Sequence, residues 1–192
     1  MSSRLPPGKV RIIAGEWRRR WLPIAGGNLV RPTTDRTRET LFNWLQPRLA
    51  ATRCLDLFAG SGVLGFESVS RGAREATLVE QSSSVVAQLR TAVAMLAAET
   101  RVTVVEKDVR LFLRSPPEIP YDVVFVDPPF SLGLVAAVLP LLTPRWLSPE
   151  ALIYLETEHE LAPVTLPDGW RMMRAGESMQ ARYCLLQAGA TR

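Results

Sequence analysis

The run Tyr121-Asp122-Val123-Val124-Phe125-Val126-Asp127-Pro128-Pro129-Phe130 predicts how the rest of the chain is arranged. Its first six residues are rich in β-branched and aromatic side chains, which is typical of a buried strand. Because proline lacks a backbone N–H and restricts the residue before it to extended geometry, the strand should end at Asp127. A carboxylate, a carbonyl and an aromatic ring are therefore expected together at a strand's carboxyl end, where open α/β sheets bind ligands.

The chemistry of this strand end suits a flat substrate that carries an amine. Asp127 and the carbonyl of Pro128 are acceptors without donors, and Phe130 offers a face for stacking. A strand followed by a rigid turn would also explain an Asp-Pro pair. The second proline and the aromatic residue favour a functional site, so we predict that Asp127, Pro128 and Phe130 are catalytic.

A glycine loop follows another predicted strand, Arg53–Phe58, and has the sequence Ala59-Gly60-Ser61-Gly62-Val63-Leu64-Gly65. Glycines permit a tight turn and a close approach of the backbone to a ligand. The Gly-x-Gly-x-x-Gly spacing alone is weak because dinucleotide enzymes share it. Asp56, near the end of the strand, would repel a pyrophosphate but can accept from an ammonium group. It therefore favours a ligand with an amino-acid part.

Two further predicted strands also end in acids. Ala76–Glu80 ends in Glu80, which can accept from both hydroxyls of a ribose. Val102–Glu106 is followed by Asp108, which can accept from an adenine amino group. Asp108 can equally cap a helix predicted for Val109–Arg114, and both roles can hold.

Strands and helices alternate along the 192 residues. This order predicts an α/β fold with a doubly wound, mostly parallel sheet, an antiparallel C-terminal hairpin and a small N-terminal hairpin and helix. The remaining predicted elements are a covering helix Gly133–Leu147 that Pro140 bends or divides, a strand Ala151–Glu156, and two strands, Trp170–Arg174 and Arg182–Leu186, around Gly176.

The basic residues are concentrated in the first quarter of the chain. Residues 1–53 hold 11 Lys and Arg against 3 Asp and Glu, whereas residues 54–192 hold 12 against 16. A hairpin is predicted for Lys9–Pro23 around Gly15-Glu16, with Arg18–Arg20 between Trp17 and Trp21. Arginines interleaved with aromatic rings suit RNA, although a solvated hairpin with ordinary surface charge is the alternative. We expect a mobile N-terminus at 1–8, an RNA-binding appendage at 9–50 and a catalytic domain at 51–187.

Composition excludes several other classes. Cys54 and Cys184 lie in apolar runs, which favours buried free thiols in a reducing, cytoplasmic compartment. His159 is the only histidine, so neither a zinc site nor a histidine-based triad is expected, and we predict no metal. No apolar run approaches the roughly 20 residues of a membrane span. A monomer without a membrane partner is expected.

The motifs together resemble a known family. Asp56-Leu-Phe-Ala-Gly-Ser-Gly62, Glu80, Lys107-Asp108 and Asp127-Pro-Pro-Phe130 resemble class I S-adenosylmethionine-dependent methyltransferases that act on exocyclic amines. Arg31-Pro-Thr-Thr-Asp-Arg-Thr-Arg-Glu-Thr-Leu-Phe-Asn43 resembles the bacterial 16S ribosomal RNA guanine-N2 methyltransferases of the RsmD type. The resemblance runs from about Arg11 to Leu186. The chain departs from it at Arg18-Arg19-Arg20, where the family pattern is Arg-Gly-Arg.

The resemblance implies a class I methyltransferase sheet of Rossmann-like type. It also implies methyl transfer from S-adenosyl-L-methionine to a guanine N2 amine of small-subunit ribosomal RNA, within a subunit or an assembly intermediate. The implied cofactor-binding residues are Asp56, Phe58, Ala59, Gly60, Ser61, Gly62, Glu80, Gln81, Asp108, Val109 and Asp127. The candidates for RNA binding are Arg11, Arg18, Arg19, Arg20, Arg31, Arg36, Arg38 and Asn43.

Three other functions share part of this pattern. A DNA adenine-N6 or protein-amide methyltransferase uses a related Asp/Asn-Pro-Pro-aromatic motif, but the basic appendage disfavours a protein and no separate DNA-recognition domain is evident. A non-catalytic RNA-binding protein on a methyltransferase fold is disfavoured because Asp56, Glu80 and Asp127 are all present. A NAD-dependent oxidoreductase shares only the glycine loop.

Overall fold

The structure is a computed structural model that describes residues 8–23, 35–129, 133–158, 165–179 and 181–189. Of the predicted site residues, Arg31 and Phe130 lie outside these ranges, as do most of the N-terminal residues 1–8. No helix within the described ranges has both the length and the apolar character needed to cross a membrane.

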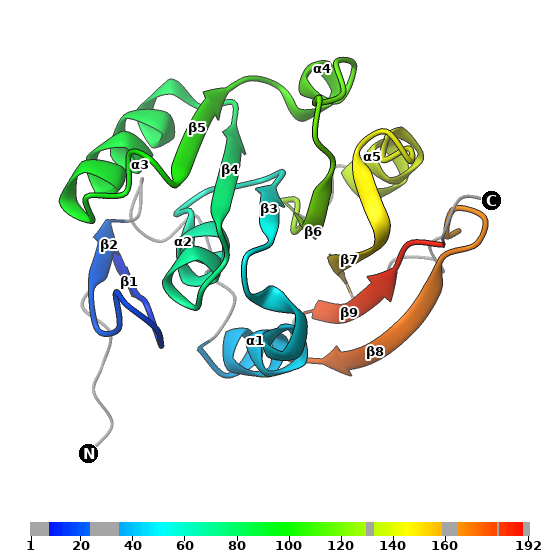
Figure 1. The fold of residues 1–192 in the computed structure, drawn as a ribbon, viewed down its shortest axis with the longest axis horizontal. Coiled ribbons are helices and arrows are strands. Elements are labelled where there is room, and N and C mark those ends of the chain that lie inside the picture. The colour runs from blue at the N-terminus through cyan, green and yellow to red at the C-terminus, as the bar shows by residue number, and fades with distance from the viewer. Residues whose placement is uncertain (1–7, 24–34, 130–132, 159–164, 180, 190–192) are drawn as a thin grey trace.

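A seven-stranded sheet runs through the centre of the molecule (Figure 1). Its strands are β3 (Arg53–Asp56), β4 (Glu75–Glu80), β5 (Val102–Glu106), β6 (Tyr121–Val126), β7 (Leu147–Glu158), β8 (Arg171–Glu177) and β9 (Ala181–Gln187). Their order is β5-β4-β3-β6-β7-β9-β8, in which the first five are parallel and β9 is antiparallel to both neighbours. The predicted doubly wound sheet with an antiparallel C-terminal hairpin is confirmed.

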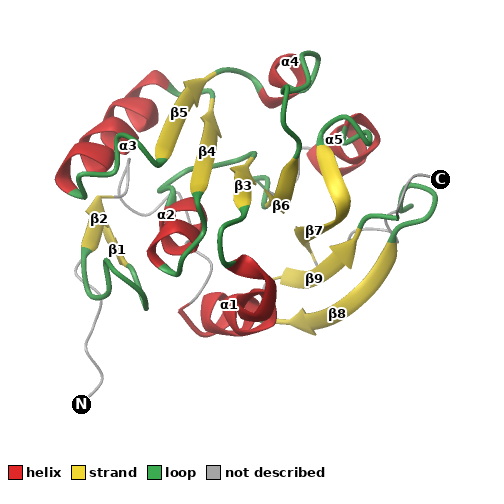
Figure 2. Ribbon diagram, viewed as in Figure 1, coloured by secondary structure: helices red, strands yellow, loops and turns green. Residues whose placement is uncertain are grey.

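Helices lie on both faces of the sheet (Figure 2). They are α1 (Asp35–Leu49), α2 (Val63–Ser70), α3 (Ser83–Met95), α4 (Val109–Phe112), α5 (Leu134–Val138) and the 3-10 turn η1 (Leu139–Leu141). Alternate residues of β6 are buried on opposite faces of the sheet. Val123 and Phe125 pack in the core with α1, α2 and α3. Val124 and Val126 pack in the core with α4 and α5. A strand that is buried on both faces reads as a continuous apolar run, which is what the sequence shows.

The crevice between the two halves of the sheet begins at β3. Strand order runs outward from β3 through β4 to β5 on one side and through β6 to β7 on the other. Consecutive connections therefore leave the sheet in opposite directions at the carboxyl ends of β3 and β6. Ligands of open α/β sheets bind at such a switch point.

Two predicted boundaries were wrong for local reasons. Gly176 lies inside β8 opposite Tyr183 instead of in the turn. A Cβ there would come within 2.7 Å of the Tyr183 ring, so the glycine provides space for the aromatic side chain. The helix predicted for 133–147 is divided at Pro140, as expected, because proline lacks an N–H and the chain tightens into η1. Its predicted end at Leu147 was wrong, since β7 begins there.

The N-terminal segment forms the predicted hairpin, but with a longer connection. β1 (Lys9–Arg11) pairs with β2 (Trp21–Pro23), and residues 12–20 between them fold against α2 instead of turning directly at Gly15-Glu16. The side chains of Val10, Ile12, Trp17 and Leu22 are buried in the same core as α1 and α2. This segment is therefore packed on the sheet domain.

Candidate active site and cofactor pocket

Three of the predicted acids meet at the carboxyl edge of the sheet. Asp56, the last residue of β3, is paired in register with Leu78 of β4 and Phe125 of β6. Glu80 and Asp127 therefore each lie two residues further along their own chains. Asp56 is only 2% exposed, whereas Glu80 and Asp127 are half-buried. The stagger places Asp56 at the bottom of the crevice with the other two acids on either side and higher up.

The glycine loop connects β3 to α2 across this edge. Gly62 donates its N–H to the Ala59 carbonyl at 2.6 Å, which closes a tight turn, and it has a φ of +73°. Gly60, with a φ of +50°, has only the Phe58 carbonyl oxygen near the place where a Cβ would lie, at 3.9 Å, so a ligand can approach its backbone. At Gly65 a Cβ would come within 2.2 Å of the Leu78 side chain. This third glycine lets α2 pack closely on β4.

Asp56 carries a buried oxygen that has no partner. Its Oδ2 is buried and accepts no hydrogen bond within the described residues. Burial raises the pKa of Asp56 to about 7, although hydrogen bonds from the Phe58 and Gly65 backbone lower it and the charge of Glu80 raises it. An unsatisfied buried acceptor is unfavourable unless a ligand supplies the donor. A cationic ammonium group would supply both the donor and the compensating charge.

Glu80 and Asp108 have backbone partners of their own. One oxygen of Glu80 accepts from the N–H of Gly60 at 3.1 Å, and the other accepts from Gln81 and Ser82, each at 2.9 Å. The carboxylate is thus held at the loop with lone pairs remaining for ligand hydroxyls. Asp108 caps α4, and its hydrogen bond to Arg110 is the main cause of its lowered pKa. The capping interpretation is confirmed, while the adenine contact stays a prediction.

The residues after β6 leave the sheet beside two groups that the sequence reasoning did not single out. Pro128 is buried, and Asp127 contributes to the raised pKa of Tyr154. Burial is the largest cause of that shift, followed by the charge of Glu156. Tyr154 donates its hydroxyl to the Glu156 carboxylate at 2.6 Å. Glu156, 7% exposed, is the last residue of the predicted strand Ala151–Glu156. An acid at the end of this strand, as at the ends of the other parallel strands, was the feature of the sequence that could have indicated its place in the site.

The predicted RNA-binding residues divide into exposed and buried sets. Arg18, Arg19, Arg36 and Asn43 are exposed. Arg18 and Asn43 both line a cleft of about 500 Å³ between the 12–20 segment and α1, together with Glu39 and Arg71. Arg20 is exposed but donates to the Met95 carbonyl at 2.7 Å.

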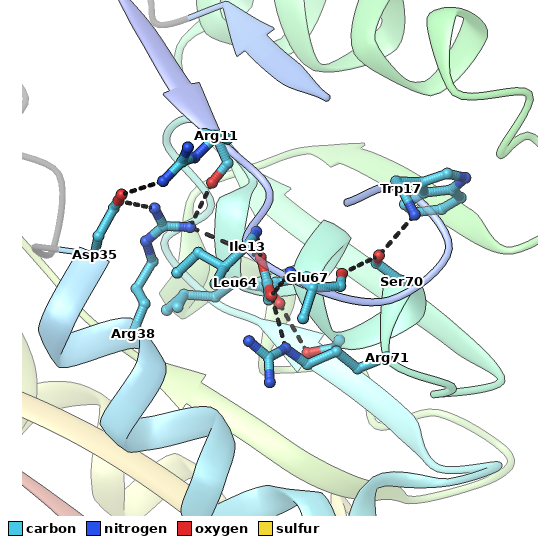
Figure 3. Close-up of polar contacts among 11 residues, drawn as sticks. Arg11, Ile13, Trp17, Asp35, Arg38, Leu64, Glu67, Ser70 and Arg71 are labelled. Atoms are coloured by element: carbon cyan, nitrogen blue, oxygen red, sulfur yellow. Dashed lines mark hydrogen bonds and ion pairs between the residues drawn. The ribbon is translucent and has the colours of Figure 1, made fainter. Parts of the chain in front are cut away.

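Arg38 was predicted wrongly as a candidate RNA contact, because its side chain is fully buried. Figure 3 shows its guanidinium between Asp35, Glu67 and the Arg11 carbonyl. Trp17, expected beside the arginines as a stacking surface, is 5% exposed and packs edge-on against Phe66. Buried partners far away in the chain hold both side chains away from solvent.

The arrangement at the strand ends matches the parts of S-adenosyl-L-methionine. The Asp56 oxygen that has no partner among the described residues fits an ammonium group, and Glu80 fits ribose hydroxyls. The uncrowded backbone of Gly60, with only the Phe58 carbonyl oxygen 3.9 Å from a Cβ position, fits the approach of a ligand to the loop. Asp127 and the Pro128 carbonyl follow β6 at the same edge. The edge can therefore hold an amino-acid nucleoside next to a group that grips an amine.

Comparisons with known proteins give consistent results. A family model described as "Conserved hypothetical protein 95" matches residues 10–187. The Escherichia coli (strain K12) protein named "Ribosomal RNA small subunit methyltransferase D" is 46% identical over 184 residues, 95% of this chain and 92% of the relative. The Haemophilus influenzae protein of the same name is 43% identical, covering 94% of each chain. The solved structure titled "Putative methyltransferase yhhF from Escherichia coli" is 46% identical and superposes with a TM-score of 0.86, covering 96% of this chain and 100% of its own.

Proposed function

Because the chain belongs to the family described as "Conserved hypothetical protein 95", whose relatives are methyltransferases of ribosomal RNA, we propose that it methylates the exocyclic N2 amine of a guanine in 16S ribosomal RNA. Its methyl donor is S-adenosyl-L-methionine. The observation that carries the proposal is the convergence of Asp56, Glu80 and Asp127 at one edge of the sheet.

The chain's residues would hold the cofactor at three points. Asp56 accepts from the ammonium group, Glu80 from the ribose hydroxyls and Asp108 from the adenine amine, while the Gly60–Gly62 backbone and the neighbouring Gln81 and Val109 line the pocket. When bound, S-adenosyl-L-methionine supplies an electrophilic methyl group on a positively charged sulfur. The groups of the protein then have to align an acceptor with that methyl group.

The acceptor amine needs help because its lone pair is delocalised into the guanine ring. Hydrogen bonds from the amine to Asp127 and the Pro128 carbonyl favour a pyramidal nitrogen whose lone pair points toward the methyl group. Alignment of this kind supplies much of the rate acceleration. No strong base is needed before attack, since the nitrogen becomes acidic only as the new bond forms. The proton that it then releases would pass to the Asp127 carboxylate, which already accepts a hydrogen bond from the amine. Phe130 would stack on the base, which leaves its helix to enter the site.

The basic appendage at 9–50 would bind the RNA, and the domain at 51–187 would perform the transfer. Arg18, Arg19 and Arg36 present exposed guanidinium groups to phosphates. Asn43, on the wall of the cleft shared with Arg18, presents an amide to a base edge. The substrate is an assembling or complete small subunit in the cytoplasm, and the enzyme acts as a monomer.

The test measures transfer of a tritiated methyl group to RNA and small subunits from cells that lack this protein. Nucleoside mass spectrometry of the product should show N2-methylguanosine, and its rate of formation should fall by about a hundredfold or more in Asp127→Ala. Methylation of subunits but not naked RNA would identify an assembled particle as the substrate. Label in DNA, protein or another nucleoside would contradict the proposal.

A further inference from the structure

Glu67, in the middle of α2, has a fully buried carboxylate that lies under the N-terminal segment (Figure 3). Its two oxygens accept from the backbone N–H groups of Ile13 at 2.7 Å and Ala14 at 3.0 Å. Arg71 donates to the same carboxylate at 2.6 Å, and the Arg38 guanidinium lies 3.8 Å away. Each of these four groups is a donor or a cation.

A second contact, one turn further along α2, holds the same segment. The Ser70 hydroxyl donates to the Ala14 carbonyl at 2.6 Å and accepts from the Trp17 N–H at 2.9 Å. Gly15 lies so close to α2 that a Cβ would fall 1.8 Å from the Ser70 carbonyl oxygen. The main chain of residues 13–17 is thus held by two side chains of α2, and at Gly15 there is no room for a side chain between this segment and the helix.

These contacts involve the part of the chain that carries the exposed arginines. Arg18 and Arg19 follow Trp17 directly, and their own N–H groups bond back to the Gly15 and Ile12 carbonyls. The orientation of both arginines therefore depends on how residues 12–17 are held. At its other end, α2 begins at Val63, directly after its N-cap residue Gly62 in the cofactor loop.

We propose that Glu67 is a positioning residue for the RNA substrate. Through Ile13 and Ala14 it fixes Arg18 and Arg19 relative to α2, and so relative to the cofactor loop from which α2 starts. This inference rests on the proposed function, in which the appendage binds ribosomal RNA. Glu67 contacts neither substrate nor cofactor and acts only through the segment that it holds.

The substitution Glu67→Gln tests this role with little change in volume. A glutamine offers one accepting oxygen and one NH2 group, so it can accept from Ile13 or Ala14 but directs a donor at the other. Gly15→Ala tests the same contact from the opposite side, because its Cβ would push the segment off Ser70. Glu177→Gln, at an exposed position on β8, is the matched control.

Two readouts separate positioning from general stability. Amide hydrogen exchange at Ile13, Ala14 and Trp17 should become at least about tenfold faster in both variants, while exchange in β3 and β6 stays unchanged. With RNA varied, KM should rise by about tenfold, while kcat at saturating RNA and the affinity for S-adenosylmethionine stay near wild type. Wild-type KM despite faster exchange, or unchanged exchange, would overturn the inference.

A double variant, Arg18→Ala with Arg19→Ala, separates this inference from the function it rests on. If the double variant weakens RNA binding but Glu67→Gln and Gly15→Ala do not, only the positioning role fails. If the double variant also binds RNA as wild type, the assignment of RNA binding to these arginines fails. Should Glu67→Gln not fold, Gly15→Ala alone decides, because it leaves the polar groups of α2 unchanged.

Discussion

Cofactor binding should depend on pH through Asp56. Burial raises the pKa of this carboxyl to about 7 in the free protein, and an ammonium group bound at Oδ2 would favour the ionised form. With a pKa of about 7, the ionised fraction of Asp56 rises from about 3% at pH 5.5 to about 76% at pH 7.5, so affinity should rise about 25-fold over this range. The cofactor's ammonium stays charged over most of this window.

Titration calorimetry with S-adenosylhomocysteine, at half-unit steps of pH, measures the dependence directly. The variant Asp56→Asn should bind more weakly at pH 7.5 and show an almost flat profile, because an amide does not titrate in this window. A flat wild-type profile would refute the proposed contact. An equal slope in Asp56→Asn would show that another group causes it.

Four further outcomes are expected. In the free folded protein, Asp56 keeps a proton up to about pH 7, whereas the unfolded chain loses it above about pH 4. Thermal stability should therefore fall as the pH rises from 4 to 7 and level off above 7. The variant Asp56→Asn, which does not titrate, should not show this fall. Asp127→Ala should slow single-turnover methyl transfer by about a hundredfold or more without changing cofactor affinity, and near-normal turnover would exclude the amine-gripping role. Arg19 has a φ of +69°, which glycine adopts more readily than arginine, so Arg19→Gly should raise the free energy of unfolding by about 0.5–1 kcal/mol in denaturant titrations. The same variant should weaken RNA binding slightly, because it loses one guanidinium. Gly65→Ala should destabilise the protein by about 1–3 kcal/mol, because its Cβ would meet the buried Leu78 side chain at 2.2 Å, and an unchanged midpoint would show that this core can adjust.

The central sheet could be predicted because its signals are local. β5 has the predicted bounds Val102–Glu106, and β6 ends at Val126, immediately before Asp127-Pro128. An apolar run that ends at proline or glycine can be predicted as a strand buried on both faces with little information from the rest of the chain. The strand-end positions of Asp56, Glu80 and Asp127 followed from the same runs.

The environment of the N-terminal arginines could not be predicted in this way. Arg38 and Arg36 are both arginines on one helix, yet Arg38 is fully buried and Arg36 is exposed. Arg38 lies on the face of α1 that is buried with Leu41 and Phe42, whereas Arg36 does not. Glu67, on another helix, provides the buried carboxylate that accompanies the Arg38 guanidinium there. Nothing in the sequence of α1 identifies that partner. Burial of Trp17 depends in the same way on Phe66 and Ser70.

The contacts of α2 with the N-terminal segment also determine when that segment can become ordered during synthesis. Ile13 is separated from Glu67 by 54 positions, and Trp17 from Ser70 by 53. At about 5–20 residues per second, roughly 3–11 s pass between the synthesis of Ile13 and that of Glu67. Until then the N–H groups of Ile13 and Ala14 lack the acceptor that they have in the folded protein. The arginines next to them are therefore synthesised early, but they take up their final orientation only after the nascent chain has extended beyond α2.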